Sequence, residues 1–101
     1  MATLRKQETV TIPIDKTAEG GTVEVIKTIR ARDVQSLTGR QDMGSILAVL
    51  IKSWNLTDDE GKPLPVNEKT VLDIDMFDAN ALIERSGLLE NVKKNTPAMN
   101  G

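Results

Sequence analysis

The side chains with the clearest capacity for chemistry are carboxylates in two groups. The first is the run Asp58-Asp59-Glu60, which is followed by Gly61 and Pro63. Such a run could bind a hard cation such as Ca²⁺, but it lacks the alternating ligands and the distal glutamate of a helix–loop–helix calcium loop. A solvated turn is therefore the better interpretation of this segment.

The second group of carboxylates is Asp73, Asp75 and Asp78. Its spacing fits helix capping, with Asp75 as the N-cap and Asp78 in the first turn, where a negative charge complements the helix dipole. A carboxylate pair could also act as general acid and base, but nothing in the sequence indicates a cleft that would separate the two pKa values. We therefore expect a protein that is not an enzyme, with no catalytic, cofactor-binding or metal-binding residue.

Composition narrows the function classes further. The chain of 101 residues has neither histidine nor cysteine, which excludes thiolate nucleophiles, Ser-His and Cys-His pairs, disulfides and zinc sites with soft ligands. Its net charge of −2 gives no electrostatic reason to expect nucleic acid or an anionic membrane as the main partner. No long apolar run or signal-peptide pattern occurs, which predicts a cytosolic protein.

The N-terminal third has the pattern of a β-hairpin over about residues 9–31. Val10, Ile12 and Ile14 alternate with polar residues, and Pro13 places this strand at a sheet edge. A second β-prone run follows the Gly20-Gly21 turn, although Ile26 falls on the opposite side from its apolar neighbours. Either both faces of that strand are partly covered, or a bulge lies near Ile26-Lys27.

The remainder predicts helices at about 33–38, 42–54, 68–72 and 75–86. Asp33, Asp42, Asn67 and Asp75 are the expected N-terminal caps, and Gly87 is the expected C′ residue, with Leu88 or Leu89 as a hydrophobic latch. The predicted fold class is α+β: an N-terminal antiparallel hairpin packed on a small helical domain of three to four helices. Residues 1–89 would form a single compact domain, and residues 90–101 a mobile C-terminal tail.

The 42–54 segment carries the most regular apolar pattern of the chain. One helical stripe is formed by Met43, Ile46, Leu47, Leu50, Ile51 and Trp54. The stripe is either plain core or, together with Leu56 and Leu64, the lining of a groove for an apolar partner segment. Trp54 suits both roles, because it has an apolar body and one N–H to satisfy.

The segment that follows the stripe resembles a known family. The run Ile51-Lys52-Ser53-Trp54-Asn55-Leu56-Thr57-Asp58-Asp59-Glu60-Gly61-Lys62-Pro63-Leu64-Pro65-Val66-Asn67 is similar to a recurring segment of tail assembly chaperones from long-tailed bacteriophages (siphoviruses) and prophages. In that family an aliphatic helix ends in Trp-x-Leu, and an acidic turn, a Leu-Pro-Val step and a short helix follow. With the N-terminal hairpin, the resemblance extends over roughly Thr9 to Gly87.

The resemblance implies an assembly factor of the host bacterial cytoplasm that is not expected in the mature virion. Its partners would be the tape measure protein, which it keeps soluble, and the tail tube protein. Homo-oligomers also fit such wide apolar stripes. The partner-binding hypothesis names Trp54, Leu56 and Leu64. The alternatives are a structural head–tail joining or tail terminator protein of the virion, and a small nucleic-acid-binding regulator.

Overall fold

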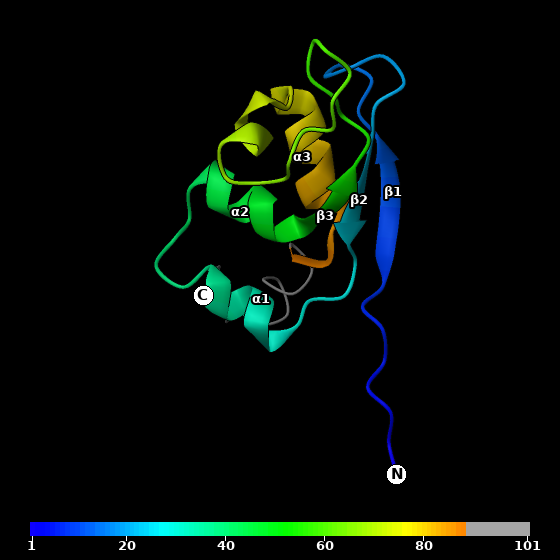
Figure 1. The fold of residues 1–101 in the computed structure, drawn as a ribbon. Coiled ribbons are helices and arrows are strands. Elements are labelled where there is room, and N and C mark those ends of the chain that lie inside the picture. Colours follow the sequence, from blue (N-terminus) through cyan, green and yellow to red (C-terminus); the bar gives the residue numbers. More distant parts are fainter. Residues whose placement is uncertain (89–101) are drawn as a thin grey trace.

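A three-stranded antiparallel sheet forms one layer of the molecule, in the order β1-β2-β3 (Figure 1). In this computed structural model, which describes residues 1–88, the strands are β1 (Thr9–Pro13), β2 (Thr22–Ile26) and β3 (Ile51–Trp54). The predicted hairpin is confirmed in β1 and β2, and β1 lies at a sheet edge as its proline requires. Residues 27–31 of the predicted hairpin are not part of a strand.

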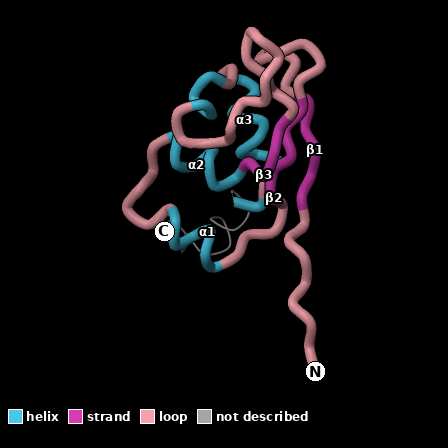
Figure 2. The backbone as a smooth tube through the Cα atoms, viewed as in Figure 1, coloured by secondary structure: helices cyan, strands magenta, loops and turns pink. Residues whose placement is uncertain are grey.

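The register of the hairpin places its apolar side chains on one face. Val10 lies opposite Val25, and Ile12 lies opposite Val23. Because successive strand residues point to opposite faces, these β-branched side chains form one apolar surface. Helices α2 and α3 cover that surface, while residues 1–8 run away from the sheet without regular secondary structure (Figure 2).

The predicted helix over 42–54 is wrong in its second part. Helix α2 covers Met43–Leu50 only, and β3 begins at the next residue. Ile51 and Trp54 pair with Val25 and Val23 of β2, so a third strand completes the sheet. Ile51 and Trp54 continue the helical spacing of the apolar stripe. Hydrogen bonding to the free edge of β2 nevertheless outweighs this helical pattern, because a hairpin of two strands alone is only marginally stable.

The irregularity expected near Ile26-Lys27 occurs earlier in the chain. The register between β2 and β3 shifts between Glu24 and Val25. Ile26 is nevertheless buried, as are Val23 and Val25. Both open interpretations of this strand therefore hold in part: it has an irregularity, and the Ile26 side chain is also covered.

Two of the predicted caps, Asp42 and Asp75, are confirmed by hydrogen bonds, whereas Asn67 lies two residues before Lys69, the N-cap of the short helix that follows it. The Asp42 carboxylate accepts from the Ser45 N–H of α2 at 3.0 Å. The Asp75 carboxylate accepts from the Phe77 N–H at 2.9 Å, at the start of α3 (Met76–Arg85). The side chain of Asn67 accepts from two backbone N–H groups just before the short 3₁₀ helix η1 (Thr70–Asp73). Side chains of this kind satisfy N–H groups that a helix start leaves free.

The first helix and the end of the last one differ from prediction. Helix α1 covers Ala31–Ser36, so Arg30 is its N-cap and Asp33 lies in its first turn, where its carboxylate accepts from the Arg30 N–H at 2.9 Å. Gly87 follows the C-cap Ser86 of α3 and so occupies the predicted C′ position, but its φ is not positive. A Cβ there would lie 2.0 Å from the carbonyl oxygen of Lys27, so close packing of two chain segments requires this glycine. Leu89 and the predicted tail over 90–101 lie outside the described residues.

The core is aliphatic and lies between the sheet and the helical layer. Its buried members come from β1, β2, α2, β3, η1, α3 and the segments next to them: Ile12, Ile14, Val23, Val25, Leu47, Ile51, Val71, Ile74, Ala79 and Leu82. The predicted α+β fold, with a hairpin packed on helices, is confirmed in this arrangement. The helices hold β3 and the segment after it against the core, where the candidate site begins.

Two carboxylates, the half-buried Glu24 and the exposed Asp42, stabilise the fold by accepting hydrogen bonds from hydroxyl groups. Glu24 accepts from the hydroxyls of Thr9 at 2.6 Å and Ser53 at 3.0 Å, and so links the outer strands to β2. These two bonds lower the pKa of Glu24 below its usual 4.5. The hydroxyl and N–H of Ser45 lower the pKa of Asp42 below its usual 3.8. Both shifts favour the ionised form in the folded state.

Stability is therefore expected to fall in acid because of these two groups. Since each pKa is lower in the folded protein than in the unfolded chain, each contribution is complete above the ordinary pKa and is lost as the pH falls through the lowered one. The thermal midpoint should be flat from neutral pH towards 4.5 and decline below it. Glu24→Gln and Asp42→Asn should each flatten that decline in a melting series. An unchanged acid profile in both variants would contradict this explanation.

Candidate functional site

The acidic turn predicted at 58–60 closes a small hairpin. The Leu64 N–H donates to the Leu56 carbonyl at 3.0 Å, and the Asp58 N–H donates to the Lys62 carbonyl at 2.8 Å. The Asp58 carboxylate accepts from two N–H groups within the turn, and Gly61 has a φ of 81°. Because the Asp58 carboxylate is hydrogen-bonded to the backbone of the turn, the segment forms a polar turn at the tip of the hairpin.

This small hairpin brings the three sequence-predicted partner-binding residues together. The Trp54 Nε1–H donates to the Leu64 carbonyl at 2.8 Å, and Leu64 is hydrogen-bonded to Leu56. All three side chains are half-buried, and those of Trp54 and Leu56 pack against the core. The indole thus has both its ring face and its N–H occupied within its own chain. This geometry makes Trp54 a cover of the core and leaves only part of the three side chains to a partner.

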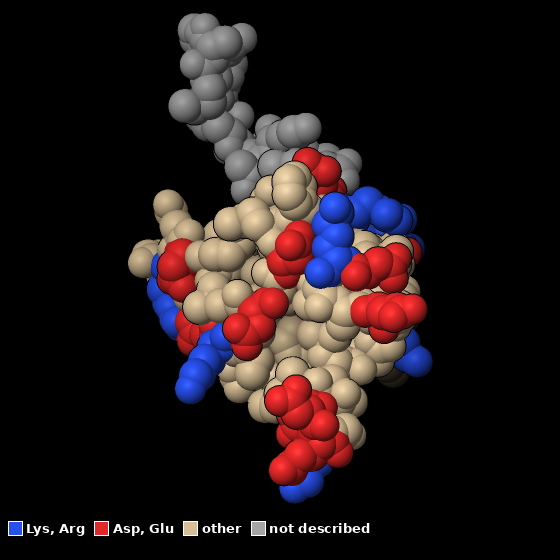
Figure 3. All heavy atoms as spheres, turned by 90° about the horizontal axis from the view of Figure 1, so that it is seen from above, with Lys and Arg blue, Asp and Glu red and all other residues tan. Residues whose placement is uncertain are grey.

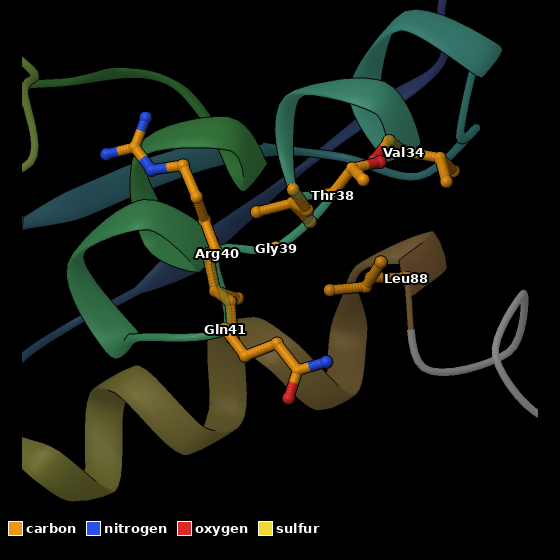
Figure 4. Close-up of a pocket in the computed structure, with 8 residues that line it drawn as sticks. Val34, Thr38, Gly39, Arg40, Gln41 and Leu88 are labelled. Atoms are coloured by element: carbon orange, nitrogen blue, oxygen red, sulfur yellow. The ribbon is translucent and has the colours of Figure 1, made fainter.

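A second apolar surface lies between α1 and α2. A cavity of about 490 Å³ opens between α1, the α1–α2 loop, α2 and the end of the described chain (Figure 4). Its apolar lining consists of Val34, Leu37, Ile46 and Leu88, and Leu88 points towards α1. This surface is called the α1–α2 groove below. Its size falls in the range of roughly 300–1,000 Å³ that is usual for ligand pockets.

Helix α1, which forms one wall of the α1–α2 groove, contributes no buried residue. Polar contacts with the N-terminal segment hold it: the side chain of Gln7 donates to Asp33 at 2.8 Å, and the Arg30 guanidinium donates to the Arg5 carbonyl at 2.6 Å. A short helix without core contacts belongs to the least stable part of a fold. This wall can therefore move at a lower energetic cost than the sheet or α2.

The opposite rim of the α1–α2 groove is held in place by an ionic and hydroxyl network. Arg40, which lines the groove, pairs with Glu68. The hydroxyl of the buried Ser45 lies 2.8 Å from carboxylate oxygens of both Glu68 and Asp42, and its single proton can be donated to either one. The groove thus has one wall fixed at the start of α2 and one wall, α1, that is attached by surface contacts.

The sequence interpretation missed the α1–α2 groove for a specific reason. Ile46 belongs to the helical stripe, for which the sequence leaves open either plain core or a groove shared with Leu56 and Leu64; it is half-buried and lines a different groove, beside α1. Val34 and Leu37, spaced three residues apart at α1, were the available signal of an apolar helix face. The sequence does not show which element this apolar face lies against; in the structure α1 lies beside α2.

The carboxylates that could have done chemistry have structural roles. Asp75 caps α3, and Asp78 is buried, with its carboxylate accepting from the N–H and the hydroxyl of Thr17, each at 2.7 Å. Within residues 1–88, no three acidic side chains gather in a way that could hold a metal ion. Asp78 lies in the first turn of α3, as predicted. In addition, its carboxylate ties the 14–21 loop to α3, which the sequence did not indicate.

No family model, curated protein or solved structure matches the chain. Among the described residues, none of the helices is both long and apolar enough to span a membrane. The geometry of the two apolar surfaces is therefore the main structural guide to function.

Proposed function

We propose that this protein is a non-enzymatic tail assembly chaperone of a long-tailed phage or prophage. It would act in the host cytoplasm, bind an apolar helical segment of the tape measure protein, help assembly of the tail tube and be absent from the finished virion. Two features support the proposal: the resemblance carried by residues 51–67, and the presence of an apolar groove on a small domain. A client of this kind needs an apolar surface and no catalytic group.

The single observation that carries the proposal is the α1–α2 groove. Four aliphatic side chains line it, and α1, one of its walls, is not anchored in the core. An amphipathic helix binds such a groove by placing successive apolar side chains into it. Because α1 can be displaced without opening the core, the groove can widen for a helix and close after release.

The small hairpin of Trp54, Leu56 and Leu64 is the competing client surface. It offers less free apolar area, because Trp54 and Leu56 pack against the core and the Trp54 N–H is satisfied by Leu64. The two surfaces lie on different elements, and each has exposed or half-buried positions that accept substitution. They can therefore be tested separately in matched variants.

The expected result is that Val34→Glu with Leu37→Glu abolishes client binding. Both positions lie outside the buried core, and a charge in the α1–α2 groove must be desolvated when an apolar helix enters it. Co-expression with a tape measure protein of a long-tailed phage, the client that the proposal names, followed by purification of the complex, measures the effect. We expect at least about a tenfold loss of bound client, which corresponds to roughly 1.4 kcal/mol.

The matched control is Leu56→Glu with Leu64→Glu in the small hairpin. Both double variants should retain the far-ultraviolet circular dichroism of the unchanged protein. Loss of client only in the hairpin variant would move the site to Trp54, Leu56 and Leu64. Full retention of the client by both variants would contradict the proposed function.

A further inference from the structure

A set of polar contacts ties the N-terminal segment to α1, the movable wall of the α1–α2 groove. The side-chain amide of Gln7 donates to the Thr28 carbonyl at 2.7 Å and to the Asp33 carboxylate at 2.8 Å. The Arg30 guanidinium donates to the Arg5 carbonyl at 2.6 Å. We call the contacts among Arg5, Gln7, Arg30 and Asp33 the N-terminal latch. Figure 1 shows the N-terminal segment and α1 at the same end of the molecule.

The N-terminal side of the latch is fixed to the sheet. The Glu8 carbonyl accepts from the Lys27 N–H at 2.7 Å, directly after β2. The Lys27 carbonyl packs against Gly87 so closely that a side chain at Gly87 would have no room. Gln7 is therefore held next to a rigid point, and its amide joins that point to the first turn of α1. The latch thus connects a fixed part of the fold with a wall that contributes no buried residue.

Helix α1 is connected to the body at both ends by chain that can change direction. Before the helix, Ile29 and Arg30 belong to no helix or strand. After it, Gly39 lies in the α1–α2 loop with a φ of 76° and with open space where a Cβ would be. Glycine adopts either sign of φ at little cost, and hinges commonly consist of a few residues at the ends of an element. Once the latch opens, α1 can therefore swing away from α2 while the core stays closed.

We propose that the N-terminal latch is an autoinhibitory contact that holds α1 over the α1–α2 groove and limits the entry of an apolar helix. The inference rests on the proposed function for the identity of that helix, the client. A client that binds only the open groove binds with an affinity reduced in proportion to the fraction of molecules that are open. Because the latch contacts are exposed or half-buried, each contributes little to stability, and a client can replace them.

The test compares Gln7→Ala with the unchanged protein in two measurements. In amide hydrogen exchange without client, the α1 amides should exchange about two- to tenfold faster, the effect of losing one net hydrogen bond. In a titration with an apolar helical peptide from a tape measure protein of a long-tailed phage, the dissociation constant should fall by the same factor, because both measurements report the open fraction. Gln7→Glu keeps the side-chain length but removes the N–H donor, and should act in the same direction.

Two controls show whether the effect is local. Lys6→Ala changes the exposed neighbour of Gln7, which is not part of the latch, and should leave both measurements unchanged. The amides of the 14–21 loop are the internal reference, because this loop lies at the opposite end of the molecule, whose surface is rich in acidic side chains (Figure 3). Exchange of that loop should not change in Gln7→Ala. An equal rise there and in α1 would indicate a general loss of stability and would overturn the latch.

The two measurements also separate this inference from the proposed function. Unchanged α1 exchange in Gln7→Ala would overturn the inference, because the latch would then not hold α1. Faster α1 exchange with equal or weaker peptide binding would overturn it as well, while the proposed function would stand. If the peptide does not bind the unchanged protein, the proposed function fails, and faster α1 exchange in Gln7→Ala would still support the latch as the contact that closes the groove.

Discussion

Replacing Asp78 by alanine is expected to lower the free energy of unfolding by about 2–4 kcal/mol. The Asp78 carboxylate is 8% exposed and accepts two hydrogen bonds of 2.7 Å from Thr17, one from the backbone N–H and one from the hydroxyl. Removing it leaves both donors without their partner, and an unpaired polar group in a buried site costs more than the bond contributed. Urea unfolding followed by tryptophan fluorescence measures the loss.

A double-mutant cycle separates the interaction from general packing. Thr17→Val removes the hydroxyl donor, and Asp78→Asn keeps one acceptor oxygen while removing the charge. Because the two residues contact each other, the double variant Thr17→Val with Asp78→Ala should be less destabilised than the sum of its parts. Additive effects, or a loss below about 1 kcal/mol for Asp78→Ala, would show that this tie does not anchor the 14–21 loop.

Trp54→Ala is expected to cost about 3 kcal/mol, at the lower end of the range for large aromatic truncations. The indole packs on the core but is only half-buried, and it also donates to the Leu64 carbonyl at 2.8 Å. Trp54→Phe keeps most of the apolar contact and should cost only about 0.5–1.5 kcal/mol, the typical net value of one hydrogen bond. Thermal or urea unfolding followed by circular dichroism measures both variants, since the fluorescence probe is lost.

The same pair of variants distinguishes a core tryptophan from an interface tryptophan. If Trp54 covers the core, Trp54→Phe should bind the client as the unchanged protein does. A Trp54→Ala variant that unfolds normally, with a cost below about 1 kcal/mol, together with lost client binding, would identify Trp54 as an interface anchor. That combination would contradict the structural interpretation and favour the small hairpin as the client site.

The local chemistry of capping made several elements predictable from the sequence. Asp42, Asn67 and Asp75 each accept backbone N–H groups at the start of a helical segment. These bonds depend on residues only two or three positions away, which the sequence shows directly. The β1–β2 hairpin was predictable for a similar reason, because its alternating apolar residues and the Gly20-Gly21 turn are local signals.

Long-range pairing was the part that the sequence could not supply. Ile51 and Trp54 continue the spacing of α2, yet they form β3 because β2 offers an unpaired edge. Asp78 lies in the first turn of α3 as predicted, but its hydrogen bonds with Thr17, 61 positions away in the chain, could not be read from the sequence. Gly87 follows the C-cap of α3 as predicted, but its close approach to the Lys27 carbonyl could not be read either. Each of these missed features is a contact between distant segments.

The candidate site also has one part that could be predicted from local sequence and one part that depends on contacts between distant segments. Residues Trp54, Leu56 and Leu64 were predicted together, and local hydrogen bonds do bring them together. The α1–α2 groove could not be predicted, because its lining comes from α1, α2 and Leu88, and because Ile46 shares the spacing of core residues. The proposed client site is therefore the α1–α2 groove and not the surface around Trp54.

The measurement that tests the central proposal most directly is amide hydrogen exchange of the protein with and without its client. An apolar helical peptide from a tape measure protein of a long-tailed phage would be the ligand. New protection is expected at α1 and at the start of α2, around Val34, Leu37 and Ile46, because α1 has no buried residue and should exchange readily when the groove is empty. Protection confined to residues 54–64, with α1 unchanged, would contradict the α1–α2 groove as the client site.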